Sequence, residues 1–443
     1  MTIYALSTPS GTSGISVIRI SGPQTKKVLT SLIEGKFPSP RKATLKKIYG
    51  IDKEIIDEGM ILWFPKPNSY TGEDIAEIHL HGSKAVINSM LFNLSKNKDC
   101  RLAEPGEFTK LAFENGKINL IKVEAISDLI SSETELQRKQ AIKFLAGDVE
   151  KTYLELRSRL LKVLSNIEAQ IDFPDEDLPE DILNNIKKET KEIIDKISKI
   201  LNDNQVGEKI RDGFKIVIIG PPNSGKSSLL NYFSKREAAI VSEIEGTTRD
   251  IIEVNLNLDG YPVKIIDSAG IRETTNPIEK KGINLALEHA KNSDLKIILL
   301  DAKNPNFKGF FDDIYDDKSL VILNKSDLIS GDFSKINLKI DDYSLISIKH
   351  NDGLEQILKK IKVFLKNNYF NENNILISRE RHRYNLEKCL EQLKLFLEKK
   401  SANDFDKAAE DLRLATRYLG KIVGDVDVEE ILGKIFNDFC IGK

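Results

Sequence analysis

The residues best suited to chemistry form a phosphate-binding loop in the middle of the chain. An apolar run, Phe214–Ile219, leads directly into "GPPNSGKSS", in which Gly220, Gly225, Lys226 and Ser227 match the pattern G-x-x-x-x-G-K-S. Backbone N–H groups and the start of the following helix can surround phosphates, Lys226 can reach the β- and γ-phosphates, and Ser227 can bind Mg²⁺. Because strand, loop and predicted helix follow in the required order, the motif predicts a binding site for a nucleoside triphosphate.

A second set of residues, after later strands, is suited to reading a guanine base. "VILNKSD" ends in Asn324 and Asp327, and the Asp327 carboxylate can accept hydrogen bonds from the ring N–H and the exocyclic amine of guanine. A site built on such bonds can reject an analogue that lacks them by roughly 10⁴–10⁵-fold. "SIK", at Ser347–Lys349, is expected to close the base pocket. The chain is therefore predicted to prefer GTP over ATP.

The turn expected near the γ-phosphate lacks a residue that Ras-like GTPases use. "VKIIDSAG" supplies Asp267 and Gly270, an Asp-x-x-Gly arrangement whose acid supports the metal shell, but the next residue is Ile271. Ras-like proteins have a glutamine there that orients the attacking water. Another group must orient the water, and a cation must meet the charge that develops on the phosphates. The residues leave open Arg249, Arg272 or a monovalent ion for the charge, and Glu273 or Glu279 for the water.

Four segments of sequence must position these residues. Residues 1–118 mix short strand-like runs with turns, which indicates an α+β unit. In 119–212 and 372–443 apolar residues recur at helical spacing, and 213–371 alternates strands and helices in the manner of a parallel sheet. An Asp259-Gly260 pair predicts a hairpin turn within that sheet. We expect a multidomain α/β and α chain whose helical domain is interrupted by an inserted α/β domain and whose two helical halves pack together.

Composition, net charge and cysteine count exclude several other classes of protein. Apolar residues make up 40% of the 443 residues, which suffices for several cores, and the net charge of −2 gives no field for coating DNA or RNA. Contact with RNA would need a local patch or a partner. No apolar run approaches the roughly 18 residues that span a membrane, and "MTIYALSTPS" has no signal-peptide features. Three distant cysteines indicate a reducing compartment. We expect a cytoplasmic protein that contacts neither membrane nor DNA.

Four further features have plain as well as functional interpretations. "SRERHRY", residues 378–384, could contact RNA or form a solvated helix face. His79 and His81 share one side of a predicted strand and could pair on a metal or form a polar rim. Cys389 lies on an apolar helix stripe and is most simply a core residue. Trp63 is expected in a core or an interface.

The chain ends in "FNDFCIGK", which places Cys440 three residues before Lys443. A prenylation box is excluded, because Gly442 is not aliphatic and lysine is not an accepted final residue. The residues alone therefore leave the purpose of Cys440 open.

Motifs spread over essentially the whole chain together resemble the MnmE (TrmE) family of tRNA modification GTPases. They are "GISVIRISG", "SYTGEDIAEIHLHG", "PGEFTKLAFENGKINL", "IDFPDEDLP", "GPPNSGKSSLLN", "EGTTRD", "DSAGIRE" and "FCIGK". The resemblance implies an inserted Ras-like P-loop GTPase domain in a homodimeric, potassium-stimulated enzyme that is activated when its GTPase domains dimerise. With an MnmG (GidA) partner it would add a carboxymethylaminomethyl or aminomethyl group to C5 of the wobble uridine (U34) of certain tRNAs.

The resemblance also implies the ions and catalytic residues. K⁺ would bind Asn223 and stand where other GTPases bring an arginine. Its further ligands would be Ser242, Ile244 and Thr247, and Mg²⁺ would bind Ser227 and Thr248. Glu279 matches the family acid that orients the water, and Arg249 and Asp250 are the accompanying switch residues. The implied GTP contacts are Asn223, Ser224, Gly225, Lys226, Ser227, Ser228, Ser242, Glu243, Ile244, Glu245, Gly246, Thr247, Thr248, Asp267, Ser268, Ala269, Gly270, Asn324, Lys325, Asp327, Ser347, Ile348 and Lys349.

The N-terminal segment would resemble the tetrahydrofolate-binding fold of aminomethyltransferases and would form the dimer. Arg19, Glu77 and Lys117 match family positions that hold 5-formyl- or 5,10-methylene-tetrahydrofolate. The C-terminal tail would fold back so that Lys443 joins this site and Cys440 lies beside the one-carbon unit. Cys440 could then be a nucleophile, a proton donor or a packing residue.

Two other functions fit parts of the sequence. A ribosome-assembly or regulatory switch GTPase would use hydrolysis only to time binding, but the sequence shows neither an RNA-binding module nor a second GTPase domain. A folate-dependent aminomethyltransferase with a regulatory GTPase would differ in its substrate. Analysis of the wobble uridine separates these functions from tRNA modification.

Overall fold

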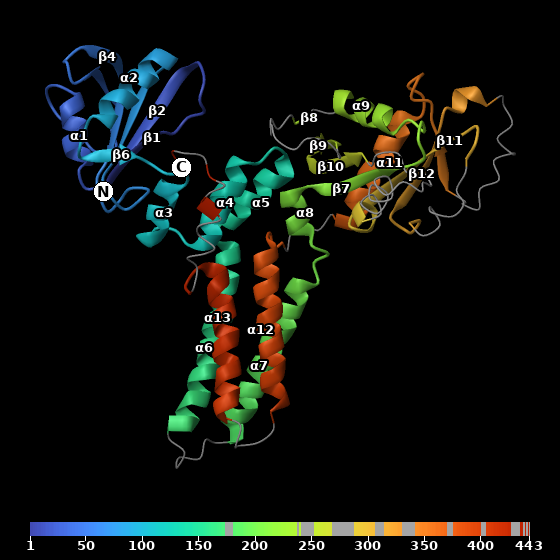
Figure 1. Cartoon of the computed structure of the whole chain (residues 1–443). Helices are drawn as coiled ribbons and strands as arrows, with labels where there is room; N and C mark the ends of the chain where they lie inside the picture. Colours follow the sequence, from blue (N-terminus) through green and yellow to red (C-terminus); the bar gives the residue numbers. More distant parts are fainter. Residues whose placement is uncertain are drawn as a thin grey trace, which may run out of the picture. The chain divides into compact units, whose positions relative to one another are not determined.

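The computed structural model describes residues 1–172, 180–236, 239–240, 252–267, 288–305, 314–329, 342–369, 375–399, 405–426, 435–436, 439 and 442 (Figure 1). The chain forms two compact units. The first comprises Met1–Ser127, Phe144–Asp177 and Lys399–Lys443, and the second comprises Asp128–Lys143 and Leu178–Glu398. The four domain limits inferred from the sequence remain predictions.

A six-stranded sheet forms the N-terminal part of the first unit, in the order β3-β4-β5-β2-β1-β6. Its strands are β1 (Thr2–Leu6), β2 (Ser13–Ser21), β3 (Thr44–Tyr49), β4 (Ile55–Phe64), β5 (Ile75–Gly82) and β6 (Cys100–Leu102). Helices α1 (Thr25–Leu32) and α2 (Lys84–Ser95) pack on one face, where alternate strand residues such as Ile18, Ile78 and Trp63 are buried. The predicted α+β unit is confirmed, and Trp63 is a core residue.

The opposite face of this sheet is only partly covered by described residues. Ile3 and Ala5 of β1 are buried there against Phe108, whereas side chains of β3 and β4 are exposed. Arg19 on β2 lies opposite Glu77 on β5, and Met60 on β4 lies between Leu45 on β3 and His79 on β5. Leu45 is 62% exposed and Met60 is 42% exposed. This face therefore has a covered part over β1 and an exposed apolar part over β3 and β4.

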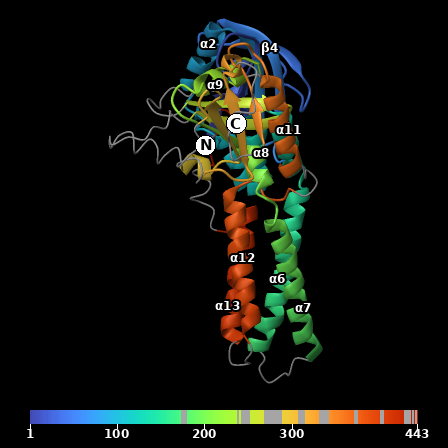
Figure 2. The ribbon, with the colours of Figure 1, turned by 90° about the vertical axis from the view of Figure 1, so that its right-hand side faces the viewer.

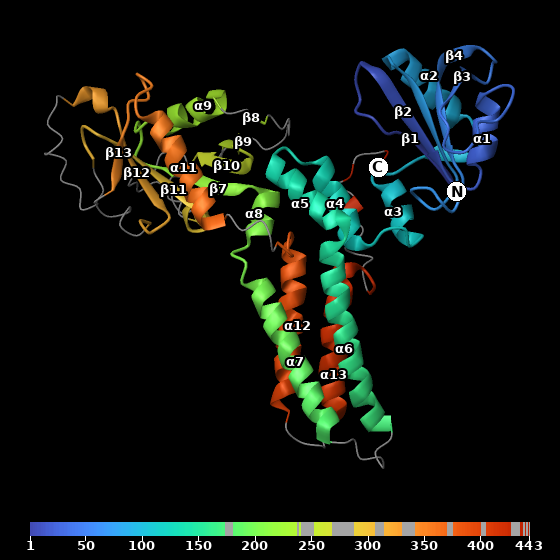
Figure 3. The same ribbon diagram turned by 180° about the vertical axis from the view of Figure 1, so that it is seen from behind.

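Helices form the remainder of the first unit. They are α3 (Glu107–Glu114), α6 (Asp148–Asp172) and α13 (Phe405–Val423), while α4 (Leu120–Ile130) and α5 (Glu135–Ala146) each cross a limit between the units. Helices α6 and α13 run alongside each other and bury Tyr153, Leu160 and Leu412 (Figures 2 and 3). Because α6 and α13 come from opposite ends of the predicted helical domain, the expected packing of its two halves is confirmed here.

The second unit begins with another helix pair, α7 (Glu180–Leu201) and α12 (Glu380–Glu398), which also joins the two helical halves (Figure 3). Ile193, Leu386 and Cys389 are fully buried, so Cys389 is a core residue as predicted. Two of the three arginines in residues 378–384 form ion pairs within the second unit. Arg379 pairs with Asp128, and Arg383 pairs with residues that precede or lie on α8 (Val206–Asp212), so these two are neither a solvated face nor free for RNA.

A seven-stranded sheet follows, in the order β13-β12-β11-β7-β10-β9-β8. Its strands are β7 (Phe214–Ile219), β8 (Ala239–Ile240), β9 (Ile252–Leu258), β10 (Tyr261–Asp267), β11 (Leu295–Asp301), β12 (Ser319–Asn324) and β13 (Tyr343–Leu345), with helices α9 (Lys226–Arg236), η1 (Ser326–Leu328) and α11 (Leu354–Tyr369). Strands β7 and β10–β13 are parallel, and antiparallel β8 and β9 form one edge. Asp259 and Gly260 have φ angles of 51° and 93°, which confirms the predicted hairpin turn.

In the described part of the chain, no helix combines the length and the apolar composition needed to cross a membrane. Cys100 and Cys389 are both free thiols, and both are buried. Burial, with a smaller contribution from Asp99, raises the pKa of Cys100 to about 11. Neither thiol is therefore placed to act as a nucleophile near neutral pH.

Candidate functional site

The phosphate-binding loop joins the buried end of β7 to the start of α9, and its glycines are required by close contacts. A Cβ on Gly220 would lie 2.1 Å from the Leu299 carbonyl oxygen, and one on Gly225 would lie 2.4 Å from Asn324 Nδ2. Gly225 has a φ of 104°, a conformation that side chains rarely adopt. Asn223 is also left-handed, with a φ of 62°, as a short amide side chain permits. The sequence thus specifies the loop's narrow turn.

Lys226 crosses this loop from the first position of α9. Its Nζ donates hydrogen bonds to the Gly220 and Pro221 carbonyl oxygens, both at 3.1 Å, and the residue is only 7% exposed. Ser227 and Ser228 follow in the first turn of the helix, whose N–H groups and dipole favour an anion. A cation and a helix N-terminus therefore face the same cavity.

Asn324 ties the base-reading segment to the phosphate-binding loop. Its Nδ2 donates to the Ser224 carbonyl oxygen at 2.8 Å, and its Oδ1 accepts from the Ile348 N–H at 3.1 Å. Asn324 is 4% exposed, so both bonds are shielded from water. The three sequence motifs, which lie up to about 120 residues apart in the printed sequence, are thereby held as one structure.

Asp327 presents a carboxylate at the other end of the cavity. Ser347 Oγ donates to Asp327 Oδ1 at 2.6 Å, and the His350 N–H donates to Ser347 Oγ at 3.3 Å. The Ser347 hydrogen bond is the main cause that lowers the pKa of Asp327 below its ordinary value, with help from the nearby His350 and Lys349. Asp327 is therefore ionised at neutral pH and able to accept hydrogen bonds from two donors.

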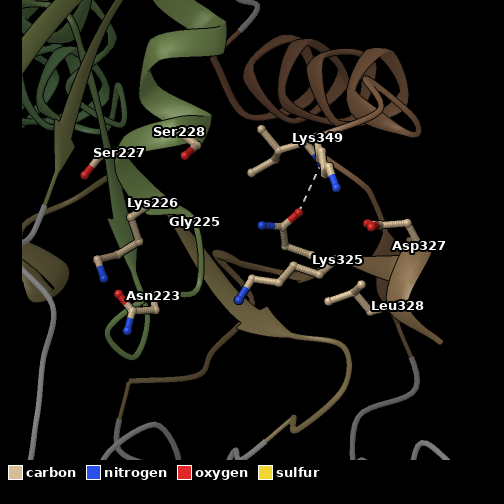
Figure 4. Close-up of a pocket in the computed structure, with 11 residues that line it drawn as sticks. Asn223, Gly225, Lys226, Ser227, Ser228, Lys325, Asp327, Leu328 and Lys349 are labelled. Carbon is tan, nitrogen blue, oxygen red and sulfur yellow. Dashed lines mark hydrogen bonds between the residues drawn. The ribbon is translucent and has the colours of Figure 1, made fainter.

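One cavity of about 580 Å³ brings these groups together (Figure 4). Its lining residues are Asn223, Gly225, Lys226, Ser227, Ser228, Asn324, Lys325, Asp327, Leu328, Ile348 and Lys349. Ten of these were predicted; Leu328 was not, although it directly follows the Asn-Lys-x-Asp motif on the wall of the cavity. Ser224 and Ser347 lie behind the lining residues that they bond. The volume suits a nucleotide-sized ligand.

Several predicted residues cannot be placed in this site. Asp267 ends β10, where its backbone pairs in register with Ile218 and Ile252. The others lie outside the described residues: Ser242, Glu243, Ile244, Glu245, Gly246, Thr247, Thr248, Arg249, Asp250, Ser268, Ala269, Gly270, Glu279, Cys440 and Lys443. The alternatives Arg272 and Glu273 also lie there.

A second polar cluster lies on the face of the N-terminal sheet opposite α1 and α2. Arg19 pairs with Glu77 through its Nε and Nη2, which lie 3.0 and 2.8 Å from Glu77 Oε1. The Arg19 guanidinium also lies 5.8 Å from the Tyr70 ring centre and 5.6 Å from that of Phe108. Burial raises the pKa of Tyr70. Lys117 is exposed, and its stem passes close to Gly72, two residues after Tyr70.

The C-terminal tail reaches the same cluster. The Gly442 carbonyl oxygen accepts hydrogen bonds from Ser7 Oγ at 3.0 Å and Arg19 Nη1 at 3.4 Å. Gly442 has a φ of 98°, and a Cβ there would lie 2.3 Å from the Leu6 carbonyl oxygen. Upstream, Phe436 and Phe439 are buried in a cluster with Leu120 and Val123 of α4. The tail is thus anchored by packing and then laid against the N-terminal sheet.

Each of the two histidines of β5 lies near a carboxylate. His81 Nδ1 lies 2.8 Å from Asp57 Oδ1, and His79 Nε2 lies 3.7 Å from Glu77 Oε2. Across the described residues, no group of three or more His, Cys, Asp and Glu side chains could hold a metal ion. The polar-rim interpretation is therefore favoured for both.

Comparisons with known proteins cover the whole chain. The family model of the MnmE helical domain matches residues 120–440, and the model described as GTP-binding protein TrmE N-terminus matches residues 2–117. The tRNA modification GTPase MnmE of Pelagibacter ubique (strain HTCC1062) is 61% identical over 446 residues, with 100% of both chains covered. The MnmE proteins of Rickettsia akari (strain Hartford) and Rickettsia prowazekii (strain Madrid E) are 45% and 43% identical, also with 100% of both chains covered.

These matches agree with the two sheets, the helix pairs and the cavity described above, and they confirm the predicted family and fold class. The chain therefore belongs to the MnmE (TrmE) family of tRNA modification GTPases, and it is a GTP-hydrolysing enzyme of tRNA modification.

Proposed function

We propose that GTP binds in the 580 Å³ cavity, with its phosphates at Lys226 and the start of α9 and its guanine at Asp327. The observation that supports this most is that one cavity presents a helix N-terminus and an ammonium group at one end and an ionised carboxylate at the other. Triphosphate needs the first, and the two donors on the guanine edge need the second. The remaining GTP contacts stay as predicted from the sequence.

We propose that Asn223 helps to bind K⁺ beside the phosphates. Asn223 lines the cavity next to Lys226, and its amide oxygen is a neutral ligand of the kind that suits a monovalent cation. A bound cation supplies positive charge where negative charge develops during hydrolysis. The proposed partners Ser242, Ile244 and Thr247, the water-orienting Glu279, and Arg249 and Asp250 lie outside the described residues.

We propose Ser227 and Thr248 as the protein ligands of Mg²⁺. Ser227 stands at the start of α9 and lines the cavity. Mg²⁺ commonly takes few protein ligands and completes its shell with phosphate oxygens and water. The lack of a three-residue acidic or histidine cluster among the described residues is compatible with that type of site.

We propose that the cluster around Arg19 and Glu77 binds the folate, with Lys117 and Lys443 as further contacts and Cys440 near the one-carbon unit. A carboxylate such as Glu77 suits the hydrogen-bond donors of a pterin ring, and Arg19 is already held between two aromatic rings. The fold of the tail supports this proposal, because Gly442 lies directly on Arg19.

Glu77→Gln is expected to weaken 5-formyltetrahydrofolate binding by about tenfold or more, because a hydrogen bond to a charged group contributes about 1.5–3 kcal/mol. GTP turnover should not change, since Glu77 and the GTPase motifs belong to different units. Isothermal titration calorimetry measures the folate affinity. The matched control is Glu58→Gln, which removes an exposed carboxylate from neighbouring β4; equal folate affinities in both variants would contradict the proposal.

We propose that the exposed part of this face of the N-terminal sheet, over β3 and β4, forms the homodimer. Exposed Leu45 and Met60 lie on this face beside His79 and the Arg19–Glu77 pair. Apolar side chains that are exposed together commonly mark an interface. Folate bound on this face would lie at or near the dimer contact.

We propose that the enzyme, with an MnmG (GidA) partner, modifies C5 of the wobble uridine in cytoplasmic tRNA. A strain that lacks the gene should contain tRNA with unmodified C5 at that uridine, and the wild-type gene should restore the modification. Mass analysis of tRNA nucleosides provides the test. Normal wobble nucleosides in the deletion strain would instead favour a switch GTPase without modification chemistry, or an aminomethyltransferase with a different substrate.

A further inference from the structure

Lys325, which lines the nucleotide cavity, is held by an acid that the sequence motifs do not contain. Lys325 Nζ lies 2.7 Å from Asp301 Oδ2, and the two side chains are 33% and 29% exposed. Figure 4 shows Lys325 extended across the cavity, with its nitrogen on the side of Asn223 and Lys226. Asp301 itself does not line the cavity, so it can act on a ligand only through Lys325.

The backbone fixes Asp301 firmly enough to serve as an anchor. Asp301 ends β11 in register with Asn324 of β12, and the Ala302 N–H donates to the Asn324 carbonyl oxygen at 2.8 Å. The second carboxylate oxygen, Oδ1, accepts the Lys303 N–H at 2.9 Å, which closes a turn of the kind that aspartate favours. One oxygen therefore holds the turn while the other holds the ammonium group.

We infer that Asp301 is a positioning residue for guanine-nucleotide binding, an inference that rests on the proposed placement of GTP. By binding the ammonium group, Asp301 keeps the stem of Lys325 extended across the cavity. Its methylene groups then form an apolar wall beside Asp327, on which a flat base and its ribose can pack. An unrestrained lysine side chain would lose rotamer entropy when the nucleotide binds, and the ion pair with Asp301 reduces that loss.

The substitution Asp301→Asn tests this role, because the amide oxygen can still accept the Lys303 N–H while the negative charge is lost. The KM for GTP and the Kd for GDP should both rise about threefold to tenfold, and kcat at saturating GTP should stay within about twofold. Asp317→Asn is the matched control, since it removes the same charge from an exposed site in the same domain. The KM for GTP, the Kd for GDP and the kcat of Asp317→Asn should equal those of the wild type.

A double-mutant cycle shows whether Asp301 acts through Lys325. Lys325→Met should weaken GDP binding, and Asp301→Asn added to it should weaken binding no further, within about twofold. Unchanged GDP binding in Asp301→Asn would overturn the inference, and so would additive effects in the double variant. Thermal melting of each variant detects a folding defect, in which case Asp301→Ser replaces Asp301→Asn in the same cycle. Failure of this cycle would leave guanine selection by Asp327 untouched, because that selection is measured separately with xanthosine triphosphate.

Discussion

Asp327→Asn should change the nucleotide preference of the enzyme from GTP to xanthosine triphosphate. The guanine edge offers two donors, the ring N–H and the exocyclic amine, and the ionised Asp327 can accept both. An asparagine can accept only one of them and must face the other with its own N–H. We expect GTP affinity to fall by about 10³-fold or more, since a site built on hydrogen bonds strongly rejects a group that leaves them unmatched.

Xanthine carries an oxygen where guanine carries the exocyclic amine, so the asparagine N–H gains an acceptor. The variant should therefore hydrolyse xanthosine triphosphate in preference to GTP, while the wild type does the reverse. Steady-state turnover with each nucleotide measures the exchange. Asp317→Asn, which removes an exposed acid from the same domain, should keep the wild-type preference. A variant at Asp327 that still prefers GTP would show that another group reads the base.

Arg383→Met should destabilise the second unit by about 3–5 kcal/mol, the usual cost of breaking a buried ion pair by removing one partner. Arg383 Nε lies 2.7 Å from Glu208 Oε1, its Nη2 lies 2.6 Å from Asp203 Oδ1, and its Nη1 donates to the Leu201 carbonyl oxygen at 3.0 Å. All three charged side chains are at most 15% exposed. Methionine would fill much of the space but leave both carboxylates without their cation.

Arg413→Met provides the matched control. Arg413 pairs with Glu168 at 3.0 Å, but these side chains are 51% and 39% exposed, so its loss should change the stability far less than the loss of Arg383. Urea unfolding followed by the circular dichroism of the helices compares the two variants through their midpoints. Similar, small shifts in both would mean that burial does not strengthen the Arg383 network.

The local motifs could be predicted from the sequence because their geometry is set by neighbouring residues. The glycines of the phosphate-binding loop and the Asp259-Gly260 turn each follow from conformations that other residues rarely adopt. Asn324 and Asp327 follow from the spacing of a motif at a strand end. Such features need no knowledge of which strand lies beside which.

The contacts that depend on sheet register could not be predicted. Arg19 meets Glu77 only because β2 and β5 are neighbours in this register, and Asp301 meets Lys325 only because β11 and β12 are. The sequence around Arg383 predicts a surface or RNA-binding residue. Its acidic partners lie about 180 residues earlier in the printed sequence, so no local pattern indicates the ion pairs. A pattern along the chain shows that a side chain is charged but not which partner will neutralise it.

The proposed K⁺ beside Asn223 would supply the positive charge that GTP hydrolysis requires. The variant Asn223→Gly tests this role most directly. Glycine accepts the left-handed backbone of this position, so the variant removes the amide without straining the loop. GTP turnover should be about tenfold faster in K⁺ than in Na⁺ for the wild type, and this difference should disappear in Asn223→Gly while GDP still binds. An unchanged preference for K⁺ in the variant, or equal wild-type rates in the two salts, would contradict the account.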